Sequence, residues 1–176
     1  MIGKFEIKEK EIIVKDYLFE PSKVYPNKII LFSEIEEIYL DTFPITLKYK
    51  NDLIFISKEK QKEMEIFVEN NHIKKATRKI NWDFITEPFL DTSFTKEEEL
   101  RTLKILAENG ISENEVKILR KEISKPMYKY NFATMLWEWV SLSLLDVLCA
   151  MKAKYKKEAF ETFYWKALEI EQRNKI

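Results

Sequence analysis

The run from Asn131 to Met151, NFATMLWEWVSLSLLDVLCAM, constrains the fold more than any other stretch of this chain. It is apolar around most of a helical circumference, and a helix of that kind is a buried one. Yet it carries two carboxylates, Glu138 and Asp146. A buried carboxylate costs several kcal/mol unless it is paired or hydrogen-bonded. We therefore predict one buried helix over 131–151 and look for a site where its acids lie.

The polar residues of this predicted helix gather along one edge when they are placed at 100° per residue. They are Asn131, Thr134, Glu138 and Ser141, with Asp146 near the margin. In one interpretation the edge meets water, or Glu138 accepts a hydrogen bond from Trp82, Tyr128 or Tyr130. In the other, the edge is a polar notch in an aromatic wall that includes Trp137 and binds a partner or small ligand.

Composition narrows the function classes. The 176 residues can form one large domain or two small ones, with enough chain to bury a core. Lysine plus arginine equals aspartate plus glutamate at 30 each, so no global charge attracts the chain to nucleic acid or to anionic membranes. The single cysteine, Cys149, excludes an internal disulfide framework. The first residues, MIGKFEIKEKE, contain no apolar signal-peptide core, so we expect a cytoplasmic protein.

Residues 1–72 have the two-residue alternation of β-strands followed by a helical stripe. Ile45, Leu47 and Tyr49 face one way in ITLKYK, and Asn51-Asp52 is suited to the hairpin turn that follows. Ser57 can cap a helix that runs to about Asn71. We predict about six short antiparallel strands and one closing helix.

This order resembles the pleckstrin-homology-like (PH-like) domains, including their bacterial relatives. The segments that carry the resemblance are LFSEIEEIYLD, PITLKYKNDLIFIS and KEKQKEMEIFVENN. The resemblance covers residues 1–72 only, and it implies a small β-barrel or sheet closed by a helix. Phosphoinositide-binding members would have a basic cluster between the first two strands, but here Lys8, Lys10 and Lys15 alternate with acids. Such folds also serve as protein-binding scaffolds, so fold alone does not decide function.

Residues 73–94 form a connector too aromatic for a solvated linker, with Trp82, Phe84, Phe89 and Phe94. We expect it to be ordered and to pack between the two halves. Its acids have two interpretations. They are turn residues that bond to nearby backbone, or they lie at the lip of a cleft. The acids concerned are Asp83, Glu87 and Asp91.

The sequence of residues 95–176 predicts a domain of about four helices. Thr95-x-x-Glu98 and Ser112-x-x-Glu115 are capping boxes that start two of them, and Pro126 is expected to end the second. The Asn109-Gly110 turn between these two helices gives the spacing of a helix-turn-helix. The acids of the second helix argue against contact with phosphates, so we do not expect nucleic-acid binding.

No enzyme template fits the chain. Its two glycines cannot build a phosphate-binding loop, and a catalytic pair would have to use the sole histidine, His72. We expect an α+β protein without a cofactor or metal that binds a protein partner, as an adaptor or as an immunity or antitoxin-like protein. An enzyme or small-ligand binder that uses Glu87, Asp91 and Glu138 is the alternative, and a lipid-binding PH-like protein is the second. The candidate binding residues are Glu87, Asp91, Asn131, Thr134, Trp137, Glu138, Ser141 and Asp146.

Overall fold

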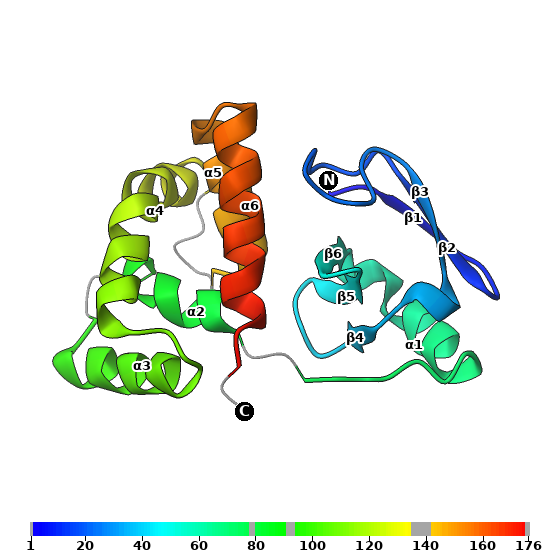
Figure 1. Ribbon diagram of the computed structural model, residues 1–176, viewed down its shortest axis with the longest axis horizontal. Coiled ribbons are helices and arrows are strands. Elements are labelled where there is room, and N and C mark those ends of the chain that lie inside the picture. Colours follow the sequence, from blue (N-terminus) through cyan, green and yellow to red (C-terminus); the bar gives the residue numbers. More distant parts are fainter. Residues whose placement is uncertain (1, 78–79, 91–93, 135–141, 175–176) are drawn as a thin grey trace. The chain divides into compact units, whose positions relative to one another are not determined.

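The computed structural model describes residues 2–77, 80–90, 94–134 and 142–174, with the backbone alone for 131–134. The chain is α+β, as predicted, and it divides into two compact units, Met1–Arg78 and Lys79–Ile176 (Figure 1). The first unit holds the strands and helix α1, and the second is helical.

The first unit contains two three-stranded antiparallel sheets with strand orders β1-β2-β3 and β4-β5-β6. Their bounds are Lys4–Ile7 (β1), Glu11–Lys15 (β2), Lys28–Leu31 (β3), Glu37–Tyr39 (β4), Ile45–Tyr49 (β5) and Asp52–Ile56 (β6). The described strands form no closed barrel, which corrects that part of our prediction. At the end of β3 the backbone N–H of Leu31 donates to the Glu34 carboxylate at 3.1 Å, and the 3-10 turn Phe32–Glu34 follows.

The core of this unit is built from the alternating faces of its strands. Ile12, Val14 and Ile30 point inward from the first sheet, whereas every residue of β6 is buried. The β5–β6 turn is centred on Lys50 and Asn51, at φ of 50° and 64°, one position earlier than predicted. Asp52 instead begins β6, and its buried carboxylate accepts hydrogen bonds from the Ser22 hydroxyl and the Lys23 N–H, at 2.7 and 2.8 Å.

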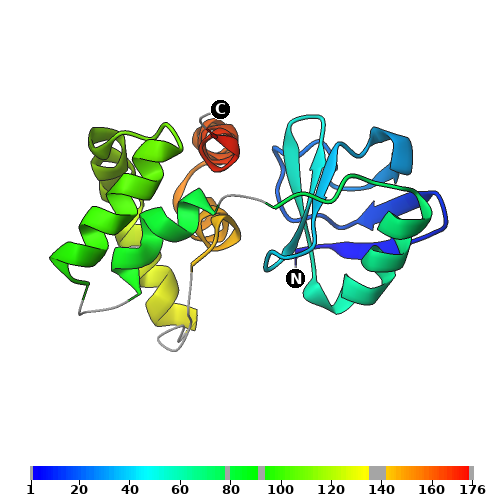
Figure 2. The same ribbon diagram turned by 90° about the horizontal axis from the view of Figure 1, so that it is seen from below.

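The predicted closing helix is present as a 3-10 turn, Lys58–Lys60, followed by α1, Gln61–Asn70 (Figure 2). The Ser57 hydroxyl caps it by accepting the Glu59 N–H, as the sequence predicted. The stripe Met64, Phe67 and Val68 is buried. Just after the helix, the Asn71 amide donates to the backbone carbonyl of Glu9 at 2.9 Å and thereby ties α1 to the β1–β2 turn.

Residues 80–90 belong to the helical unit, where α2, Asn81–Thr86, contacts each of the other four described helices of the unit (Figure 1). Trp82 is fully buried, and its indole N–H donates to the Ala167 carbonyl at 2.8 Å. A 3-10 turn, Glu87–Phe89, follows α2. Trp82 is therefore part of the helical core, whereas Phe84 and Phe89 are half-buried, and packing between the two units stays a prediction.

Helix α3, Lys96–Glu108, begins with the predicted Thr95–Glu98 capping box. Helix α4, Glu113–Thr134, passes through Pro126, so the prediction that Pro126 ends this helix was wrong. Proline has no N–H to give to the carbonyl four residues earlier, which is that of Glu122. The Lys154 ammonium donates to this carbonyl at 3.1 Å instead, and this bond compensates for the one that Pro126 removes.

Two further helices complete the unit: α5, Leu144–Lys154, and α6, Lys157–Gln172. The prediction of a single helix over 131–151 is therefore wrong, because α5 starts afresh at Leu144, after the part of α4 that the structure describes. Ser143 has extended backbone angles, φ −84° and ψ 172°, and acts as the N-cap of α5, so no helix runs through it. Among the described residues, no helix combines the length and the apolar character needed to span a membrane.

Candidate functional site

The predicted polar edge of 131–151 is only partly within the description. Asp91, Trp137, Glu138 and Ser141 lie outside the described residues. Asn131 and Thr134 lie in the last described turn of α4, and their side chains are likewise outside the description. Their role as a notch for a partner or ligand stays a prediction.

Asp146 has a clear structural position as the third residue of α5. One carboxylate oxygen accepts hydrogen bonds from the Ser143 N–H and hydroxyl, at 2.8 and 2.9 Å. The other accepts the Tyr130 hydroxyl at 3.2 Å. These contacts make Asp146 the acid of a capping box that starts α5 and links it to α4.

Glu87 is also paired within its own unit. Its two carboxylate oxygens accept hydrogen bonds from the Arg101 guanidinium at 2.8 Å and from the Thr102 hydroxyl at 2.5 Å. Both donors lie on α3, so Glu87 fastens the turn after α2 to that helix. Among the described residues, no group of three or more His, Cys, Asp or Glu side chains is placed to hold a metal ion.

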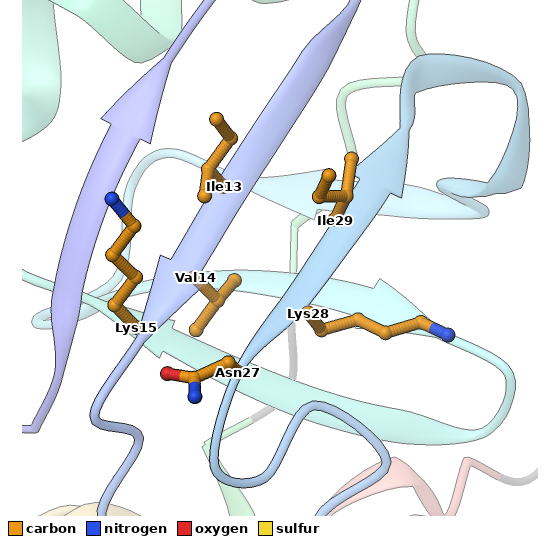
Figure 3. A pocket seen from close by; sticks show the side chains of 6 residues that line it. All are labelled: Ile13, Val14, Lys15, Asn27, Lys28 and Ile29. Carbon is orange, nitrogen blue, oxygen red and sulfur yellow. The ribbon is translucent and has the colours of Figure 1, made fainter.

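An exposed apolar surface on the first sheet is the most distinctive candidate site of the β unit. We call it the β3 edge surface and define it by Ile13, Lys15, Lys28 and Ile29, which Figure 3 labels, together with Leu31. Ile29 and Leu31 are 51% and 47% exposed, although both lie within a strand. Ile13 is directly opposite Ile29 across the β2–β3 pair. Together with Val14 and Asn27, four of these residues line an open depression of about 620 Å³.

The outer side of β3 pairs with no other described strand, because β2 is its only neighbour in the described sheet. The Phe32 N–H bonds to the Lys10 carbonyl at 3.0 Å, which marks that residue pair as hydrogen-bonded. Since hydrogen-bonded and non-bonded pairs alternate in an antiparallel ladder, the amide groups of Ile29 and Leu31 point away from β2. The Leu31 N–H donates to Glu34, and Leu31 is the N-cap of the 3-10 turn that follows, so the outward groups that remain on this edge are the N–H and C=O of Ile29.

The charge of this surface is positive where its lysines project. Figure 3 shows Lys28 extending beyond β3, away from β2, whereas Lys15 extends toward β1. Neither lysine forms a salt bridge with a described residue, in contrast with Lys4, which pairs with Asp16 at 2.8 Å. The acids of this face are already engaged: Glu6 and Glu11 share the Lys8 ammonium, at 4.0 and 3.3 Å.

Sequence reasoning predicted about six strands within residues 1–72 but did not single out Ile29 as a site residue. An isoleucine in a strand is typical of a buried position, and the segment KIIL does not show which of its apolar residues face water. Exposure on this edge follows from strand order, which sequence alone does not provide.

Comparison with protein-family models and with curated proteins finds no match to this chain.

Proposed function

We propose that this is a non-catalytic intracellular binding protein whose β3 edge surface receives an extended segment of a partner protein. The observation that carries the proposal is the combination of exposed Ile29 and Leu31 with a backbone edge at Ile29 that no other described strand pairs. Proteins ordinarily protect such edges with charges, prolines or covering loops. An edge left apolar is suited to accept an added strand.

The geometry supports the binding mode in two ways. The outward N–H and C=O of Ile29 offer the backbone hydrogen bonds that bind an added strand. The side chains of Ile13, Ile29 and Leu31 offer apolar contact to alternate residues of that strand, because residues two apart share a face. The backbone hydrogen bonds would supply affinity, and the side chains of Ile13, Ile29 and Leu31 would select peptides with apolar residues at alternate positions.

The chemistry of the partner follows from charge. Lys28 projects past the open edge and Lys15 lies on the apolar face, both without a salt bridge among the described residues. We therefore expect an extended segment that alternates apolar residues with at least one aspartate or glutamate. Complementary charges steer association and fix register more than they add affinity.

The arrangement of the unit is compatible with this role. Six strands followed by α1 support the resemblance to PH-like domains, which serve as protein-binding scaffolds. We include in the proposal that residues 1–72 form a PH-like domain and that the helices of the second unit form a bundle. Adaptor and immunity or antitoxin-like functions are both compatible with a partner segment bound at this edge.

A defined peptide library tests the proposal. The full chain is used to select from displayed random peptides, and the enriched peptides are then synthesised and titrated calorimetrically. We expect alternating apolar residues with an acidic residue. We also expect Ile29→Lys to weaken binding at least tenfold, because it places a charge on the edge that the peptide must cover.

The matched control is Ile66→Lys, which changes an isoleucine of similar exposure, 59%, on α1 of the same unit. It should leave peptide affinity unchanged. Equal loss in both variants, or peptides without an apolar alternation, would contradict the proposed site. A homodimer that is lost on Ile29→Lys would show that a second copy, and not a different partner, occupies the edge.

A further inference from the structure

A separate groove lies in the helical unit between α4 and α5. It is lined by Lys125, Pro126, Lys129, Tyr130, Ala150, Ala153 and Lys154, and it has a volume of about 440 Å³. Pockets that bind small molecules have volumes of roughly 300 to 1,000 Å³. The two helices contact each other along this side of the unit (Figure 1).

The groove is hollow because of the residues that α5 presents there. Ala150 and Ala153 have no side chain beyond Cβ, so little of α5 projects into the space between the two helices. On the α4 side, Pro126 and Tyr130 lie four residues apart, which places them on one face of the helix. The floor and walls are therefore an alkyl and aromatic surface.

Three ammonium groups line this apolar groove. Lys125 and Lys129 are exposed, and neither forms a salt bridge with a described residue. Lys154 donates one hydrogen bond to the Glu122 carbonyl and lies over the Tyr155 ring at 4.9 Å, so it is held in place without being neutralised. A chain of zero net charge thus concentrates positive charge at one apolar groove.

The nearby acids Glu122 and Asp146 are bonded to other groups, and neither forms a salt bridge with these three lysines. The Glu122 carboxylate accepts the Tyr155 hydroxyl and the Lys166 ammonium, each at 2.9 Å. Asp146 accepts three hydrogen bonds from Ser143 and Tyr130. Burial raises the pKa of Tyr130 well above its usual range, with the Asp146 charge acting in the same direction, so its hydroxyl stays protonated and keeps this bond.

We propose that the α4–α5 groove binds a small organic anion that has a single carboxylate or a similar head group and an apolar body. The lysines would receive the head group, and the Pro126, Tyr130, Ala150 and Ala153 surface would receive the body. This function is independent of the β3 edge surface, because it uses a different unit and a different ligand class.

Decanoate is the defined probe. Its uncharged analogue decanol has the same apolar body without the carboxylate, so it separates the apolar contribution to binding from that of the lysines. The full chain is titrated calorimetrically with each. We expect decanoate to bind with a Kd below about 1 mM, and decanol to bind at least about tenfold more weakly because it cannot use the lysines. Equal affinity for both, or no binding of decanoate at about 1 mM, would overturn the proposal.

Two variants locate the binding. Lys129→Gln should weaken decanoate binding about two- to fivefold, the effect of removing one solvent-exposed charge contact. Ala153→Leu fills the groove from an exposed position on a helix and should weaken it by more than about tenfold. Lys104→Gln, an exposed lysine on α3 of the same unit without a salt bridge to a described residue, is the matched control and should have no effect.

Circular dichroism and thermal unfolding of each variant keep loss of binding distinct from loss of fold. Loss of binding in Lys104→Gln equal to that in Lys129→Gln would contradict this location. In a last experiment, binding of the full chain to vesicles that contain anionic phosphatidylglycerol is measured. Binding to vesicles without binding of monomeric decanoate would replace the free anion with a lipid surface as the ligand.

Discussion

At the scale of single residues, the most informative group is the buried amide of Asn81 at the start of α2. It donates to the backbone carbonyls of Ile170 and Arg173, at 2.8 and 3.1 Å, where α6 ends. Its side-chain oxygen accepts the Asn109 amide at 2.7 Å. Helix ends leave carbonyls without intrahelical partners, and this side chain satisfies them inside the core.

Asn81→Ala should therefore lower the free energy of unfolding by about 2 to 4 kcal/mol, because it leaves several buried polar groups without partners. The measurement is urea unfolding of the full chain followed by circular dichroism. Asn114→Ala, at an exposed position in the first turn of α4, should change it by less than about 0.5 kcal/mol. Similar losses in the two variants would mean that the buried network does not stabilise the unit.

Cys149 offers a test of burial through pH. Burial raises the pKa of its thiol to about 11 from an ordinary value of 9.0, and the Asp146 charge acts in the same direction. Because the folded state favours the protonated thiol, its contribution to stability is present below pH 9 and is lost as pH rises through 11.

We expect alkylation of Cys149 by iodoacetamide to be about a hundredfold slower at pH 8 in the folded protein than in urea, because the thiolate is the reacting form. The rate should rise with pH up to about 11 when folded and to about 9 when unfolded. Superimposable pH profiles in the two states would contradict the effect of burial.

At the scale of elements, helix starts followed sequence rules more closely than helix ends did. Ser57, Thr95 and Ser112 each accept a backbone N–H at the start of the helical segment that the sequence assigned to them. Pro126 did not end α4. The Glu122 carbonyl, which loses its helix bond to this proline, accepts a hydrogen bond from Lys154 of α5 instead. A cap is local in sequence, whereas rescue of a proline needs a partner from another element.

The capping box of α5 gives a test at this scale. Asp146→Ala removes the acceptor of the Ser143 N–H and the Tyr130 hydroxyl, and it should cost about 1 to 2 kcal/mol in the free energy of unfolding. The matched control is Glu158→Ala, an exposed acid in the first turn of α6, which should cost about 0.5 kcal/mol or less. Thermal and urea unfolding measure both, and a loss no larger than the control's would remove Asp146 from the cap.

At the scale of the whole molecule, a net charge of zero does not exclude local surfaces with an excess of positive charge. The chain has 30 basic and 30 acidic side chains, which led us to expect no attraction to polyanions. In the structure many of these charges form salt bridges with one another. The lysines of the β3 edge surface and of the α4–α5 groove form none with a described residue, and they lie beside apolar surface. Binding to small or extended acidic ligands depends on such local excess and not on net charge.

The sequence by itself determined the α+β class, the strand alternation of the first unit and the caps that start α1, α3 and α4, because each depends on residues close in the chain. It did not determine that 131–151 is interrupted, since the Ser143–Asp146 cap lay hidden inside an apolar run. Of the candidate site, it predicted a polar edge on 131–151, which stays a prediction, and it missed Ile29 and Leu31. Only the tertiary structure decided which strand is an edge and where two alanines of α5 meet α4, because both depend on the order in which distant segments pack.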